Sequence, residues 1–102
     1  MIYKVVFSPE SSDHLLSLYQ HISASSPRNA QQYTSAIVDY CLTLEAFPHR
    51  GSKRDDIRLG MRITNYKKRT IIAFAVNDNL AQVAIIGIYY GGQDYETILH
   101  DE

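Results

Sequence analysis

Residues 61–90 read MRITNYKKRTIIAFAVNDNLAQVAIIGIYY and contain three candidate strands in a row. The first, residues 61–66, alternates between a face with Met61 and Ile63 and a face that begins with Arg62. The other two, residues 69–76 and 80–90, are β-branched and apolar, and the Asn-Asp-Asn between them favours a hairpin turn. The Tyr-Lys-Lys-Arg turn between the first two is a weaker signal because it lacks glycine. Short connections between consecutive strands predict an antiparallel meander.

The segments before this meander favour one strand and two helices. Residues 2–7, IYKVVF, are β-branched and aromatic, as in an opening strand. Serine followed by proline, at positions 8–9 and again at 26–27, supplies a capping side chain and a residue suited to the first helical turn. Apolar residues then recur three or four positions apart over residues 15–22 and 30–47, which indicates two amphipathic helices.

These elements predict a single α+β domain over residues 1–102. Its order is an N-terminal strand, a helical hairpin, a three-stranded antiparallel meander and a short C-terminal helical turn, in two layers. A chain of 102 residues is long enough for one core without staples. No secretory leader or membrane span is expected, so the predicted location is the cytoplasm. Neither a metal nor a cofactor is expected, and the single cysteine, Cys41, is predicted to be buried.

The charges are segregated along the chain. Eight basic and two acidic residues lie between His49 and Arg69, whereas the remainder has two basic and nine acidic residues. Because a solvated face mixes its signs, this pattern predicts an electropositive surface for a polyanion or an acidic partner. The alternative is a basic surface that keeps the protein soluble or pairs with acids elsewhere in the fold. His14 and His21, on the first helix, are expected at the surface.

Four segments together resemble the RelE/ParE superfamily of bacterial type II toxin–antitoxin toxins, and its ParE-like plasmid-stabilisation branch most of all. They are YKVVFSPE, FPHRGSKRDDIRLGMR, RTIIAFAV and IYYGGQDYETIL, in an order that spans nearly the whole chain. The resemblance implies a growth-inhibiting toxin that a cognate antitoxin holds inactive by wrapping its flexible end around the sheet and helical hairpin. It also implies a toxin–antitoxin hetero-oligomer that contacts operator DNA only indirectly, through the antitoxin.

The branches of this superfamily differ in their targets. ParE-like members are associated with DNA gyrase, and we expect this target, reached by binding and not by catalysis. The residues expected to contact gyrase or the antitoxin are Arg50, Arg54, Arg58, Arg62, Lys67, Lys68, Arg69 and Tyr90. Arg58 and Arg62 are expected to be exposed.

RelE-like members instead cut messenger RNA on the ribosome, with cations on the central strands and a tyrosine or histidine near the carboxyl end. For a ribonuclease, Arg62, Arg69 and Tyr90 are the candidate catalytic residues, since RNA cleavage needs phosphate-binding cations and a proton donor. Gly87 stands where many members have an arginine, which leaves that set incomplete. Tyr89 and Tyr90 point to opposite faces, so at most one joins a basic surface. A third alternative is a non-toxic homologue that only binds an antitoxin.

Overall fold

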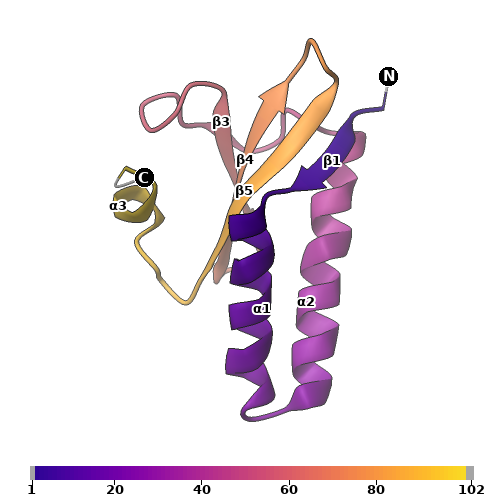
Figure 1. The fold of residues 1–102 in the computed structure, drawn as a ribbon, viewed down its shortest axis with the longest axis vertical. Coiled ribbons are helices and arrows are strands. Elements are labelled where there is room, and N and C mark those ends of the chain that lie inside the picture. Colours follow the sequence, from indigo (N-terminus) through magenta and orange to yellow (C-terminus); the bar gives the residue numbers. More distant parts are fainter. Residues whose placement is uncertain (1, 101–102) are drawn as a thin grey trace.

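The computed structural model describes residues 2–100, and Met1, Asp101 and Glu102 of the predicted domain lie outside the described residues. The chain runs from strand β1 (Lys4–Phe7) through helices α1 (Pro9–Ser23) and α2 (Pro27–Leu42) to a 3₁₀ turn, η1 (Thr43–Glu45). Strands β2 (Ser52–Lys53), β3 (Met61–Tyr66), β4 (Thr70–Asn77) and β5 (Gln82–Tyr90) follow, and helix α3 (Tyr95–His100) comes last. The predicted α+β order is confirmed (Figure 1).

The strands form one sheet in the order β1-β5-β4-β3-β2. The meander of β3, β4 and β5 is antiparallel, as predicted, and β1 pairs parallel with β5. Two details were not predicted from the sequence. One is the two-residue strand β2 beside β3, and the other is a bulge in β5, where Ala73 pairs with Gly87 but Phe74 pairs with Ile85. The bulge adds one residue to β5, so the two-residue alternation of side chains is interrupted there. Val83, Ile85 and Ile88 can therefore all face the same core.

The helical hairpin begins and is capped as predicted. Ser8 and Ser26 are the N-caps, and their hydroxyl oxygens accept from the amides of Ser11 (3.0 Å) and Asn29 (3.2 Å). The second helix is shorter than the apolar repeat suggested, since it tightens into η1 after Leu42. Tightening changes the angular spacing of side chains, so Phe47, expected on the buried stripe, is 60% exposed.

One face of the sheet packs against α1 and α2 to form the main core. Phe74, Ile72, Val83 and Ile85 of the sheet and Ile37 of α2 are among its fully buried side chains, as is Cys41. Burial raises the pKa of the Cys41 thiol to about 12, so its thiolate is not populated near neutral pH. Cys41 is therefore a packing residue.

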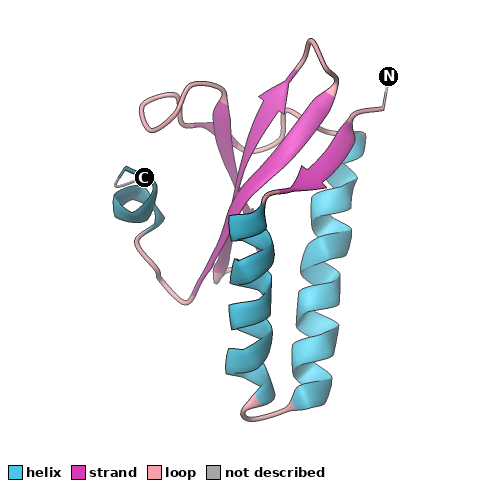
Figure 2. Ribbon diagram, in the orientation of Figure 1, coloured by secondary structure: helices cyan, strands magenta, loops and turns pink. Residues whose placement is uncertain are grey.

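The opposite face of the sheet is also apolar, and α3 covers part of it (Figure 2). Met61, Ala73 and Tyr89 of the strands are buried there together with Leu99 of α3. The predicted two-layer packing thus has a partial third layer. No helix in residues 2–100 is both long and apolar enough to cross a membrane.

The N-cap of α1 and a residue of that helix complete the hydrogen bonding of β5 beyond the end of β1. The Ser8 hydroxyl donates to the carbonyl of Ile86 (3.1 Å), and the amide of Ile88 donates to Nδ1 of His14 (3.1 Å). His14 is therefore half-buried and not a plain surface residue, because β5 continues past the end of β1 and its backbone groups there need other partners. His21, two turns further along the same face of α1, is exposed as expected.

Candidate functional site

The cations predicted to form one surface lie in two separate places. Arg50, Arg54, Arg58 and Arg62 belong to the segment from the end of η1 to β3, whereas Lys67, Lys68 and Arg69 form the β3–β4 turn. The two groups differ in what their charged ends contact.

Arg62 is bound to its own fold. Its Nε donates to the carbonyl of Arg50 (3.0 Å), and one terminal nitrogen donates to the carbonyls of His49 (2.6 Å) and Gly51 (3.4 Å). The exposure expected for Arg62 is wrong, since its side chain is half-buried beneath this loop. A planar guanidinium with several donors suits this clasp, because it serves consecutive carbonyls that no strand partner reaches. Gly51 has φ +81° and packs so tightly on Ile63 that a side chain would collide with its carbonyl.

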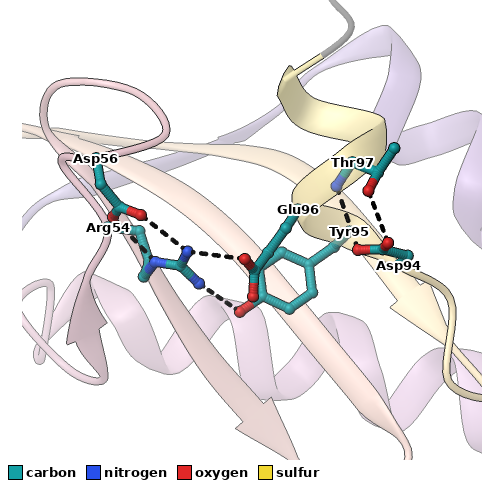
Figure 3. A network of polar contacts seen from close by, with 6 residues as sticks. All are labelled: Arg54, Asp56, Asp94, Tyr95, Glu96 and Thr97. Atoms are coloured by element: carbon teal, nitrogen blue, oxygen red, sulfur yellow. Dashed lines mark hydrogen bonds and ion pairs between the residues drawn. The ribbon is translucent and has the colours of Figure 1, made fainter.

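Arg54 holds the loop before β3 against α3 (Figure 3). Its guanidinium makes two 3.0 Å hydrogen bonds to Asp56, donates to the Tyr95 hydroxyl at 2.7 Å and lies 3.3 Å from Glu96. The Arg54 hydrogen bonds lower the pKa of Asp56 and raise that of Arg54 itself. The side chain is 18% exposed, so little of its charge faces solvent.

Arg50 is also engaged within the molecule. Its guanidinium donates to the Thr43 hydroxyl (2.8 Å) and lies 5.1 Å from the Tyr40 ring and 5.4 Å from the Phe47 ring. This cation–π contact places the positive charge beside α2. Arg58 is exposed in the neighbouring loop. At least three of the four arginines expected to contact a partner are thus engaged within the fold.

The β3–β4 turn presents its cations to solvent. Lys67, Lys68 and Arg69 are all exposed, and within residues 2–100 Lys68 and Arg69 have no side-chain hydrogen bond or ion pair. Lys67 lies 5.6 Å from the Tyr66 ring and has φ +55°, a left-handed conformation that costs a non-glycine residue about 1 kcal/mol.

A groove of about 650 Å³ runs between this turn and the helical hairpin. Three tyrosines stand in its wall: the Tyr33 ring meets Tyr66 edge-on at 5.9 Å and Tyr90 at 6.0 Å. The Tyr33 hydroxyl is fixed by a 2.6 Å hydrogen bond to Thr70. The residues that line the groove are Ile22, Asn29, Gln32, Tyr33, Ala36, Tyr66, Lys67, Lys68, Arg69 and Tyr90. The groove is thus aromatic within and basic at its rim.

Tyr90 joins the basic turn in this groove, whereas Tyr89 is 3% exposed in the core beneath α3. The expectation that one of the two tyrosines would be core is confirmed. The Tyr89 ring lies over Gly87, where an added side chain would collide with it. The missing arginine at position 87 therefore leaves no gap, because the ring occupies its place.

The residues considered for RNA cleavage do not converge. Arg69 and Tyr90 line the same groove, but Arg62 lies near the other end of β3, with its guanidinium bound to loop carbonyls. The face of the central strands that α3 covers carries apolar side chains and Tyr89 in place of cations. No cluster of histidine, cysteine and carboxylate suited to a metal ion occurs among residues 2–100.

A second polar cluster was not anticipated from the sequence. Asp78, in the β4–β5 turn, accepts from the Tyr3 hydroxyl (2.7 Å) and lies 2.9 Å from Nε2 of His49. The hydrogen bond from Tyr3 and that from His49 lower the pKa of Asp78. This cluster joins β1, the loop after η1 and the β4–β5 turn. The signal in the sequence was weak, since the three residues are far apart in the chain.

Comparison with solved structures identifies the fold. The chain superposes on the chromosomal ParDE toxin–antitoxin system from P. aeruginosa with a TM-score of 0.74 and 18% identity, covering 87% of this chain and 96% of the other. For the RelBE2 toxin–antitoxin complex from Mycobacterium tuberculosis the TM-score is 0.65 and the identity 19%, with 89% and 100% covered. No curated protein matches the sequence.

The family model for the ParE toxin of the type II toxin–antitoxin system parDE matches residues 5–95. This match extends from β1 to the start of α3 and includes the groove and both groups of cations. The chain therefore belongs to the ParE toxin family of type II toxin–antitoxin systems.

Proposed function

We propose that this single-domain toxin acts in the cytoplasm by binding DNA gyrase, and that a cognate antitoxin holds it inactive. The β3–β4 turn is the observation that carries the proposal. It presents Lys67, Lys68 and Arg69 without side-chain ion pairs among the described residues, and it keeps Lys67 in a strained conformation. Exposed charges of one sign steer a macromolecular partner and fix its orientation.

Binding is favoured over catalysis because the side chains needed for RNA cleavage are not gathered. Cleavage requires a base for the 2′-hydroxyl, an acid for the leaving oxygen and cations on the phosphate, all within hydrogen-bond reach. Arg69 and Tyr90 share the groove, but Arg62 is fixed elsewhere. This arrangement supports a toxin that obstructs its target over one that cuts RNA.

The antitoxin is proposed to occupy the groove between the basic turn and the helical hairpin. The ParDE system from P. aeruginosa and the RelBE2 complex from Mycobacterium tuberculosis, which share this fold, are toxin–antitoxin assemblies, and this supports a protein partner for the chain. The operator would then be reached through the antitoxin. The toxin's own net charge is −1, which disfavours indiscriminate binding to nucleic acid.

Purified gyrase provides the test. The parent toxin should inhibit supercoiling and cause cleaved DNA to accumulate. The triple variant Lys67→Ala/Lys68→Ala/Arg69→Ala should be at least ~10-fold less potent, because the loss of about 0.5 kcal/mol of binding free energy per exposed charge adds up over three charges. The matched control is Lys4→Ala/Arg28→Ala, which removes two exposed cations outside the groove.

Two results would overturn the proposal. One is equal inhibition of gyrase by the triple variant and the control. The other is codon-dependent cutting of messenger RNA on ribosomes by the parent toxin with no effect on gyrase. Growth of cells that overproduce the toxin without its antitoxin distinguishes a third case, because a harmless protein would be an antitoxin-binding homologue.

A further inference from the structure

A second hollow lies beside the groove, on the other side of Tyr90. It has a volume of about 410 Å³ and lies between α1 and the end of β5. Its lining residues are His14, Ser17, Leu18, His21, Ile88, Tyr90, Gly91 and Gln93. Since Tyr90 lines both spaces, an extended chain that crosses this ring would occupy the two together.

The polar groups of this hollow are oriented as hydrogen-bond donors. The Ile88 amide is a donor, so Nδ1 of His14 must accept its hydrogen bond, and the neutral ring then has its proton on Nε2. In the same way, Oε1 of Gln93 accepts from the amide of Tyr90 at 2.9 Å, which leaves the Gln93 amino group as a donor. Because backbone amides of β5 occupy the acceptor atoms of His14 and Gln93, the groups left for a ligand are donors.

Neither space has an acidic side chain among its lining residues. The groove has Lys67, Lys68 and Arg69 at its rim, and the hollow adds His21 and the Ser17 hydroxyl to the two donors already described. A ligand that passes from one space to the other thus meets lysine and arginine side chains at one end and further hydrogen-bond donors at the other. Carboxylates complement both ends, and apolar side chains complement the tyrosine wall between them.

We propose that the hollow is a carboxylate-binding subsite and that, with the basic turn, it seats one extended acidic peptide segment across Tyr90. The inference rests on the proposed function, in which the antitoxin is the partner that brings such a segment. An acidic peptide fits better than a nucleic acid, because the tyrosine rings already pack edge-on against one another, whereas base stacking needs an open ring face. The same segment would cover Lys67, Lys68 and Arg69, so antitoxin and target compete for the turn directly.

Fluorescence anisotropy with defined peptides tests this site. The probe is a fluorescein-labelled dodecapeptide that repeats Glu-Leu-Asp-Ser, and its uncharged counterpart repeats Gln-Leu-Asn-Ser. We expect the acidic peptide to bind the folded toxin at least ~10-fold more tightly, with an affinity that falls as salt rises. Amide signals of Ser17 and Gly91, as well as those of Lys68, should shift in the NMR spectrum of the complex.

Gln93→Glu is the decisive variant. A carboxylate keeps the acceptor for the Tyr90 amide but replaces the donor group with a negative charge, so the fold is retained and the acidic peptide should bind at least ~5-fold more weakly. Gln20→Glu makes the same change at an exposed position of α1 outside both spaces and should bind as the parent does.

Equal binding of the acidic peptide to Gln93→Glu and to the parent would overturn the proposal, as would equal affinity for the two peptides. If a 12-nucleotide oligodeoxythymidine binds more tightly than the acidic peptide, the groove is a nucleic-acid site and the proposal is wrong. Gyrase inhibition by the parent is measured separately, without peptide. A toxin that inhibits gyrase but binds no acidic peptide would refute this inference alone, and one that binds the peptide but spares gyrase would refute the proposed target alone.

Discussion

The cations of residues 50–62 and those of residues 67–69 are neighbours in the sequence and differ in what they contact. Arg62 clasps the carbonyls of a loop, Arg54 bridges that loop to α3, and both are withdrawn from solvent. Lys68 and Arg69 sit in the β3–β4 turn, where they are exposed and no acid lines the adjoining groove. Equal charge density along a chain therefore says little about function until the acceptors around each cation are known.

The physical reason for the difference is the supply of unpaired backbone and carboxylate oxygens. The segment before β3 has little regular structure, because β2 contains two residues, and its carbonyls need donors from elsewhere. The β3–β4 turn closes directly on the pair Tyr66 and Thr70, so few of its backbone groups are left without a partner. Arg62 is bound where backbone carbonyls lack other donors, whereas Lys68 and Arg69 have no side-chain hydrogen bond or ion pair among the described residues.

Removal of the Arg62 clasp should have the largest effect on stability. Arg62→Ala leaves the carbonyls of His49 and Arg50 without their donor, and we expect a loss of about 2–3 kcal/mol in the free energy of unfolding. Urea denaturation measures it, with Lys68→Ala as the control that should stay within about 0.5 kcal/mol of the parent. If both variants lose the same amount, the contrast between the two groups of cations is wrong.

Removal of the Arg54 bridge should act locally. Arg54→Met keeps much of the side-chain volume but breaks the contacts with Asp56, Tyr95 and Glu96 that hold α3. Amides of α3 should then exchange with solvent at least ~10-fold faster while those of β4 and β5 are unchanged, because short, sparsely anchored segments open independently of the core. Hydrogen exchange followed by NMR reports both, and unchanged exchange in α3 would mean that Leu99 alone anchors the helix.

Acid should weaken the first region and spare the second. The pKa of Asp56 is lowered in the folded protein by its hydrogen bonds to Arg54. Its stabilising contribution is therefore present above the ordinary carboxyl pKa of about 4 and is lost as the pH falls through that value towards the lowered one. Thermal unfolding between pH 7 and pH 2.5 should show a smaller decrease in Tm for Asp56→Asn than for the parent. Asp13→Asn, which changes an exposed carboxylate of α1, serves as the control.

The smallest expected change in stability lies in the turn and has the opposite sign. Lys67→Gly relieves the left-handed strain and should stabilise the fold by about 0.5–1 kcal/mol, less the greater chain entropy of glycine in the unfolded state. The same change removes one charge and should weaken toxicity about two-fold. Denaturation and growth assays measure the pair of effects. A variant that is more stable and equally toxic would show that Lys67 is not used.

Local physical chemistry made much of this fold predictable. The Ser-Pro pairs at 8–9 and 26–27 cap helices through their own hydroxyls, and the alternation of Met61 and Ile63 with Arg62 fixes which side of β3 faces the hairpin. The opposite orientations of Tyr89 and Tyr90 follow from the same two-residue period. These signals involve residues close together in the chain, so they can be recognised from the sequence alone.

The membership of the groove depended on contacts between distant segments. Tyr33 of α2 and Tyr66 of β3 are far apart in the sequence and meet in the groove wall. His14 was expected at the surface, but its Nδ1 accepts from the amide of Ile88. The sequence by itself determined the order of the elements, their caps and the concentration of positive charge. Tertiary structure alone decided which cations are bound and which are free, because a guanidinium finds its acceptors in space and not along the chain.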